Sequence, residues 1–266
     1  MVVGDLLAEL RENILRDKSD QVSGTALDQL WSDATLIRYI NEAHIRFAKR
    51  SECLRDVTPS ELTQVNTVVG TERYALDPKV IGVLSARFMG PPNPDGADLA
   101  RAGHANLDTY RATDNMFFDT SYLVTAIPGK TLAFSTDEGM LADGRNALNS
   151  MCFRVFPNVG AGYAGLIQLR IVRFPLYKLS LDNLDATPEI PEQYHLNMLD
   201  WAGYLALRQP DLDVAGGDAP QRAKDLADSF EKHIQDAKRE IQRRMFAPAA
   251  WQFGQNGFSY QRDWIG

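Results

Sequence analysis

The sequence has little cysteine, no excess of positive charge and no long apolar run. Its two cysteines, Cys53 and Cys152, lie in unrelated segments, which excludes a disulfide scaffold and suits a reducing compartment. Twenty-eight Lys and Arg against 35 Asp and Glu give a net charge of −7, the wrong sign for a protein that grips DNA through its phosphates. No segment approaches the roughly 18 consecutive apolar residues of a membrane span, and Asp5 and Glu9 interrupt the N-terminus. We therefore expect neither a signal peptide nor a membrane span.

The 266 residues are 44% hydrophobic, which is enough for a substantial core, and both ends of the chain carry helical patterns. Apolar residues at helical spacing predict a first helix over residues 2–17. A second helix is predicted after Ser32, a favourable N-cap residue, and it ends in the basic Arg46, Lys49 and Arg50. The residues expected to face the core on this second helix recur every three or four positions: Leu36, Ile40, Ala43 and Phe47.

The middle of the chain is rich in short segments that resemble β-strands. Six such segments are β-branched or aromatic and are bounded by turn residues: 63–69, 80–88, 122–127, 131–134, 151–156 and 167–174. A short helix is predicted over residues 97–110, carried by Leu99, Leu107 and Tyr110. This composition predicts a β-rich domain.

Helical periodicity returns after Pro188. Pro191 suits the first turn of a helix that Pro210 ends, and a longer helix is predicted from Asp218 to about residue 245. Apolar gaps of three and four along this longer helix form a packing seam, represented by Leu226, Phe230, Ile234 and Ile241. The seam indicates packing against the chain's own helices, which is the favoured alternative, or against a neighbouring subunit.

The last 21 residues, 246–266, have many aromatic side chains and almost no charge. Six of the chain's 25 aromatic residues lie here: Phe246, Trp251, Phe253, Phe258, Tyr260 and Trp264. Disordered tails are normally poor in aromatic side chains, because these side chains seek burial. A stretch this short has little chance of forming its own core, so we predict that it binds a groove on another protein or on a sibling subunit. Docking back onto its own domain is the alternative.

Together these patterns predict an α+β protein with a split helical domain. Residues 1–58 and 188–245 are expected to form one helical bundle, residues 59–187 an inserted β-rich domain, and residues 246–266 an extended C-terminal arm. Helices that recur on both sides of a strand-rich block are most economically one domain with an insertion.

No pattern in the chain meets the requirements of a catalytic, cofactor or metal site. GAGYAG at 160–165 matches GxGxxG, but a strand-like segment follows it instead of a phosphate-binding helix, so we interpret it as a loop. PGKT at 128–131 lacks the first glycine of a phosphate-binding loop and is interpreted as a hairpin turn. The other candidates lack ligand or acid/base spacing: His44, His104, His195, His233, Asp137, Glu138, Asp182, Asp185, Asp211, Asp213 and Asp218. We predict no enzymatic activity, no cofactor and no metal.

Two patterns in the helical parts resemble head-to-tail adaptor proteins of tailed bacteriophages. The first is Trp31-Ser32-Asp33 at a helix start, followed by Tyr39-Ile40-Asn41-Glu42-Ala43. The second is Pro191-Glu192-Gln193-Tyr194-His195 ahead of a long charged helix. The resemblance covers the two flanking helical parts and leaves the β-rich middle unmatched.

The resemblance implies a structural virion protein at the phage neck, assembled in the host cytoplasm. It implies a ring, expected to be a dodecamer, that joins the portal protein to a tail or nozzle protein, with a C-terminal extension docked into the portal. DNA would be non-specific cargo in the channel, and an acidic protein would hold it weakly. Two other classes stay open: a virion-associated hydrolase that degrades the cell wall, and a monomeric ligand-binding domain that uses the glycine loop.

Overall fold

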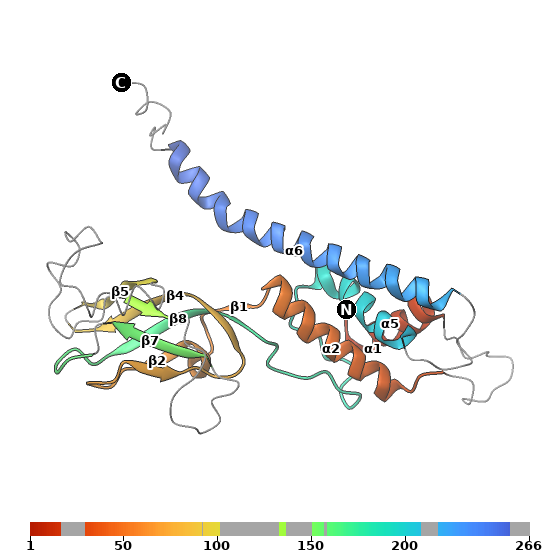
Figure 1. The fold of residues 1–266 in the computed structure, drawn as a ribbon, viewed down its shortest axis with the longest axis horizontal. Coiled ribbons are helices and arrows are strands. Elements are labelled where there is room, and N and C mark those ends of the chain that lie inside the picture. The colour runs from red at the N-terminus through yellow and green to blue at the C-terminus, as the bar shows by residue number, and fades with distance from the viewer. Residues whose placement is uncertain are drawn as a thin grey trace. The chain divides into compact units, whose positions relative to one another are not determined.

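The computed structural model of the chain describes residues 1–16, 30–91, 93–101, 133–136, 151–156, 159–208 and 218–255. Within these residues the chain is α+β, as predicted, and it divides into two compact units. The helical unit contains Met1–Cys53 and Pro175–Gly266, and the β unit contains Leu54–Phe174. Figure 1 shows the elements of each unit, coloured from red at the N-terminus to blue at the C-terminus.

The N-terminal segment of the helical unit contains two helices. The first, α1 (Val3–Glu9), continues into a π-helical turn, η1 (Leu10–Leu15). The second, α2 (Asp33–Ser51), begins where Ser32 Oγ accepts a hydrogen bond from the Thr35 N–H at 3.2 Å, so the predicted N-cap is confirmed. The predicted core stripe is also confirmed, because its four side chains are fully buried: Leu36, Ile40, Ala43 and Phe47.

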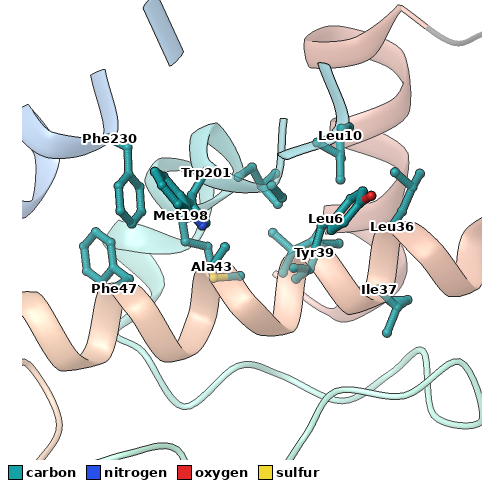
Figure 2. Close-up of a cluster of buried hydrophobic side chains, with 14 of the residues drawn as sticks. Leu6, Leu10, Leu36, Ile37, Tyr39, Ala43, Phe47, Met198, Trp201 and Phe230 are labelled. Atoms are coloured by element: carbon teal, nitrogen blue, oxygen red, sulfur yellow. The ribbon is translucent and has the colours of Figure 1, made fainter. Parts of the chain in front are cut away.

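The C-terminal segment of the helical unit adds a 3₁₀ turn, η3 (Glu192–Tyr194), and the helices α5 (His195–Leu207) and α6 (Ala219–Gln255). Because α5 packs against α2, α6 and η1, it is buried on a wider face than its sequence predicts. Figure 2 shows this core, in which Leu6 and Phe47 of the N-terminal segment lie with Met198, Trp201 and Phe230 of the C-terminal segment. Residues from both ends of the chain therefore build one hydrophobic core.

The β unit contains a curled sheet (Figure 1). Its strands, in spatial order, are β1 (Arg55–Asp56), β8 (Leu166–Arg173), β4 (Val80–Gly90), β5 (Asn93–Arg101), β6 (Ala133–Ser135), β7 (Cys152–Phe156) and β3 (Arg73–Ala75), and β2 (Gln64–Asn66) also pairs with β8. The described pairings are antiparallel except that of β5 with β6. Phe134 and Phe153 are fully buried and stack with ring centroids 5.3 Å apart.

The helix predicted over residues 97–110 is wrong for residues 97–101, which belong to strand β5. Antiparallel pairing places Leu99 opposite Ala86 of β4, and Leu99 is buried while Asp98 and Ala100 on either side are exposed. Pairing with a long neighbouring strand therefore outweighs the local helical pattern. Residues 102–110 lie outside the described residues.

The first predicted strand, over residues 63–69, is shorter in the structure. A helical turn, α3 (Ser60–Thr63), comes first, and only Gln64–Asn66 pairs with β8. The strand predicted over residues 122–127 lies outside the described residues.

The helix α6 is longer than predicted. We expected it to end near residue 245 and residues 246–266 to be extended, but α6 continues to Gln255, so the extended conformation is wrong for residues 246–255. Lengthening an existing helix needs no new nucleation, and the extension holds Ala247, Ala249 and Ala250, although Pro248 among them has no N–H to donate to the helix. Residues 256–266 lie outside the described residues.

Candidate interaction surfaces

The first resemblance pattern ties the start of α2 to η1. Asp33 Oδ1 accepts two hydrogen bonds from Arg11, at 3.1 Å from Nε and 2.5 Å from Nη2. Arg11 Nη2 also donates to the Trp31 carbonyl at 2.8 Å. Since Arg11 is only 8% exposed, its charge needs this compensation. The pattern therefore stabilises a helix junction.

Asn41, in the same pattern, holds the crossover segment (residues 175–190) against α2. Its Oδ1 accepts from the Leu179 N–H and its Nδ2 donates to the Leu179 carbonyl, both at 2.8 Å. Glu189 is a second anchor, because its Oε1 accepts from the N–H groups of Leu176 and Tyr177 at 2.5 and 3.1 Å. These side chains satisfy the backbone of a segment that contains no helix or strand of its own.

The second pattern holds α6 near the point where the helix leaves the core. Tyr194 Oη and Gln193 Nε2 both donate to Glu240 Oε2, at 2.5 and 3.0 Å, and Arg244 pairs with the same carboxylate. Burial, followed by the hydrogen bond to Glu240, raises the pKa of Tyr194 to about 12. The hydrogen bond from Tyr194 is the main reason that the pKa of Glu240 is lowered. At neutral pH the phenol therefore stays protonated and the carboxylate ionised, as this contact requires.

The four seam residues of α6 differ in how deeply they are buried. Phe230 and Ile234 are fully buried in the core of their own unit, where the Phe230 ring centroid lies 5.3 Å from that of Trp201. Leu226 is partly buried against the same core, and Ile241 is partly exposed. Contact with the chain's own helices therefore occupies Phe230 and Ile234 completely.

The distal part of α6 (residues 238–255) extends past Ala237, the last buried residue among the described side chains of this helix. Eighteen residues correspond to about 27 Å of helix. Within it, the basic segment (residues 238–244) has four basic side chains and one acidic one, a net charge of +3 on a chain whose net charge is −7. Lys238 at the start of distal α6 still pairs with Glu52, the C-cap of α2, at 3.3 Å, and Figure 1 shows the C-terminal end of α6 standing clear of α1, α2 and α5.

The predicted portal-binding arm is only partly described. Phe246, Trp251 and Phe253 belong to the backbone of α6, whereas Phe258, Tyr260 and Trp264 lie outside the described residues. The three described residues thus continue the same helix that carries the basic segment.

The GAGYAG segment is a loop that leads into β8, as predicted. Gly162 has a φ of +85°, and a Cβ on Gly165 would lie 2.6 Å from the Met89 carbonyl oxygen of β4. These glycines therefore allow a turn and a close approach between backbones. Strand β8 begins directly afterwards at Leu166, so the loop lacks the helix N-terminus that a phosphate site needs. PGKT at 128–131 lies outside the described residues.

Asp200, Ser229 and His233 form a polar cluster between α5 and α6 whose composition matches a nucleophilic triad. Ser229 Oγ donates to Asp200 Oδ2 at 2.7 Å, and His233 Nε2 lies 3.2 Å from the same hydroxyl and 3.5 Å from the same carboxylate oxygen. In a triad, the serine and the carboxylate contact different ring nitrogens of the histidine. Here both meet Nε2, so the cluster links two helices and does not activate the serine.

Burial raises the pKa of Asp200. The hydrogen bond from Ser229 and the charge interaction with His233 partly oppose this rise. His44 and His195 are also buried, and His195 Nε2 lies 2.7 Å from the Ile190 carbonyl oxygen. Among the residues that the structure describes, no three His, Cys, Asp or Glu side chains could hold a metal ion together. Five candidate residues lie outside that part of the chain: His104, Asp137, Glu138, Asp211 and Asp213.

One surface that the sequence analysis missed is the crossover segment, which exposes Tyr177, Leu181 and Leu184. Its only signal in the sequence is a few apolar residues within a turn-rich stretch, and this signal does not distinguish an exposed segment from a buried one. The basic segment, by contrast, is visible as the charge cluster KREIQRR. None of the helices in the described parts of the chain is sufficiently long and apolar to span a membrane.

A family model, that of the SU10 adaptor protein, matches residues 1–252. No curated protein matches the chain at a significant level. The match includes both resemblance patterns, the β-rich middle of the chain and nearly all of α6.

Proposed function

Since the chain belongs to the SU10 adaptor family, whose model spans residues 1–252, we propose that this phage adaptor joins the portal to the tail at the virion neck. Many copies, expected to be twelve, form a ring that holds the tail or nozzle protein and leaves a channel for DNA. The protein acts as a structural component rather than as an enzyme.

The observation that carries the proposal is the continuation of α6 for 18 residues past Ala237, the last buried residue among the described side chains of this helix. Near its start, distal α6 is held to its own unit by Lys238, which pairs with Glu52, and by Glu240, which accepts hydrogen bonds from Tyr194 and Gln193. Because helices in proteins draw most of their stability from tertiary packing, we propose that the rest of distal α6 packs against a partner outside its own core. The aromatic residues that follow the basic segment supply the apolar anchors that such a partner would bury. We assign the portal protein as this partner.

The roles of the pattern residues support a structural protein. Asp33, Asn41 and Tyr194 each connect segments of the helical unit. Asp182 and Asp185, the candidate acid/base pair, both lie exposed in the crossover segment. No observation favours the hydrolase.

The test is truncation after Met245. The shortened chain keeps every residue of α6 that is buried among the described side chains, so its thermal unfolding should stay within roughly 5 °C of the full chain, while binding to the portal protein of the same phage should be lost. Binding is measured by surface plasmon resonance and by incorporation into procapsids that lack the adaptor.

Single substitutions test the two halves of the arm one at a time. Trp251→Ala and Trp264→Ala should each weaken portal binding by about 2 kcal/mol, or roughly thirtyfold, if each ring fills a desolvated pocket. Phe246→Leu, which keeps an apolar side chain, serves as the control. Unchanged portal binding and incorporation by the truncated chain would remove the arm from the mechanism.

A further inference from the structure

Two surfaces of the helical unit carry opposite charge. The acidic loop (residues 180–186 of the crossover segment) contains two carboxylates and no basic residue, whereas the basic segment of α6 has a net charge of +3. In Figure 1 the crossover segment lies on the side of α2 away from α6. The two surfaces of one chain therefore do not meet each other.

The acidic loop also exposes apolar side chains. Leu181 and Leu184 are 39% and 43% exposed, and the nearby Tyr177 is 74% exposed. Backbone contacts hold the loop in place, since Asn41 binds Leu179 just before it and the Gly4 N–H donates to the Leu184 carbonyl at 3.0 Å. A held segment that presents several large apolar side chains to water marks an interaction site.

Two of the four basic side chains of the basic segment share one helical face, whereas Lys238 pairs with Glu52 and Arg244 with Glu240 within the chain. Arg239 and Arg243 are one turn apart, so their side chains project from the same side of α6, and both are exposed. Their position beyond Ala237 places them on the part of the helix that extends past the core. This face is accessible to another molecule. Arg239 pairs with Asp236 one turn earlier at 3.3 Å, and Arg243 leaves the face with a positive charge that complements the acidic loop.

We propose that the basic segment of one copy of this chain binds the acidic loop of the next copy, with its arginines opposite the loop carboxylates. The inference rests on the proposed ring and names the contact that builds it. Because the two surfaces differ, the contact is heterologous, and its repetition around an axis closes a ring. Charge complementarity selects and orients the neighbour, while the exposed apolar side chains of the loop contribute buried area.

The test uses two full-length charge-reversal variants. The loop variant carries Asp182→Lys and Asp185→Lys, and the helix variant carries Arg239→Glu and Arg243→Glu. Each variant alone sets like charges against each other and should raise the dissociation constant for self-association roughly a hundredfold. When the two variants are mixed, the reversed loop of one can bind the reversed helix of the other. Their unchanged surfaces can likewise bind each other, so alternating assemblies should form again.

Assembly is measured by sedimentation velocity and mass photometry, with circular dichroism to check folding. Lys224→Glu with Lys232→Glu, which changes the net charge equally at exposed positions nearer the start of α6, is the matched control and should assemble like the natural chain. Full assembly of either reversal variant alone, or failure of the two folded variants to assemble when mixed, overturns this interface and leaves a ring built in another way. A natural chain that stays monomeric up to its solubility limit overturns the ring together with the interface, whereas portal binding by the arm is tested separately.

Discussion

His44 is buried and Arg46 is half-buried, two residues apart on α2. The Arg46 guanidinium stacks over Trp201, with its carbon 3.7 Å from the ring centroid. His44 is 1% exposed, and within the described ranges neither ring nitrogen has a hydrogen-bond partner. Burial, opposed by nearby Glu189 and assisted by His195, lowers its pKa to about 4. The imidazole is therefore neutral at physiological pH.

This neutral histidine predicts a loss of stability in acid. Because the pKa of His44 is lower in the folded chain than the 6.5 of an ordinary histidine, the unfolded chain binds a proton first as the pH falls. The free energy of unfolding should therefore decrease between about pH 6.5 and pH 4, by about 3 kcal/mol from this group. Urea unfolding of the natural chain and of His44→Phe at about pH 7 and about pH 4.5 measures the difference. An equal acid loss in both proteins would contradict the assignment.

The elements of the helical unit depend on polar contacts between segments as well as on the shared core. The crossover segment forms turns but no helix or strand, and the side chains of Asn41 and Glu189 bind part of its backbone. Where α6 leaves the core, the carboxylate of Glu240 holds it to Tyr194. These contacts position the two surfaces that we assign to the neighbouring copy.

Asn41→Ala should therefore release the crossover segment. The substitution removes both hydrogen bonds to Leu179 and should lower the free energy of unfolding by about 2 kcal/mol. Amide exchange at Leu179 should become faster, as measured by hydrogen–deuterium exchange with mass spectrometry. Asn66→Ala, at an exposed position of β2, is the control and should change neither quantity. Unaltered exchange at Leu179 in Asn41→Ala would show that the segment is held by other contacts.

At the scale of the whole molecule, the chain enters and leaves the β unit at adjacent points. The Arg173 N–H donates to the Leu54 carbonyl at 3.0 Å, and Arg173 also pairs with Asp56. The residues of the helical core all come from Met1–Cys53 and Pro175–Gly266. Among the residues that the structure describes, this core is therefore built from the helical unit alone.

Replacing Leu54–Phe174 with a short Gly/Ser linker should leave a folded helical protein. The ends to be joined are close, so a few flexible residues suffice, and the thermal midpoint should stay within roughly 5 °C of the midpoint for the same unit in the full chain. Circular dichroism and calorimetry measure helical content and cooperativity. A shortened chain that melts without a cooperative transition would show that the helical unit depends on the β unit.

The sequence by itself determined the features that depend on neighbouring residues. Ser32 caps α2, the stripe containing Leu36 and Phe47 is buried, and the glycine loop leads into a strand, because capping and periodicity act within a few residues. The α+β class follows from the same local patterns. The two resemblance patterns could likewise be found in the sequence, and the family match includes both of them.

Only the tertiary structure decided which segments far apart in the sequence pair or pack with each other. Pairing with β4 makes a strand of residues 97–101, and Asn41 finds its partner 138 positions away at Leu179. The extension of α6 past Ala237 places a basic surface beyond the core against which the earlier part of the helix packs. Such contacts depend on which surfaces the folded chain brings together, and a periodic pattern carries no information about a partner so far along the chain.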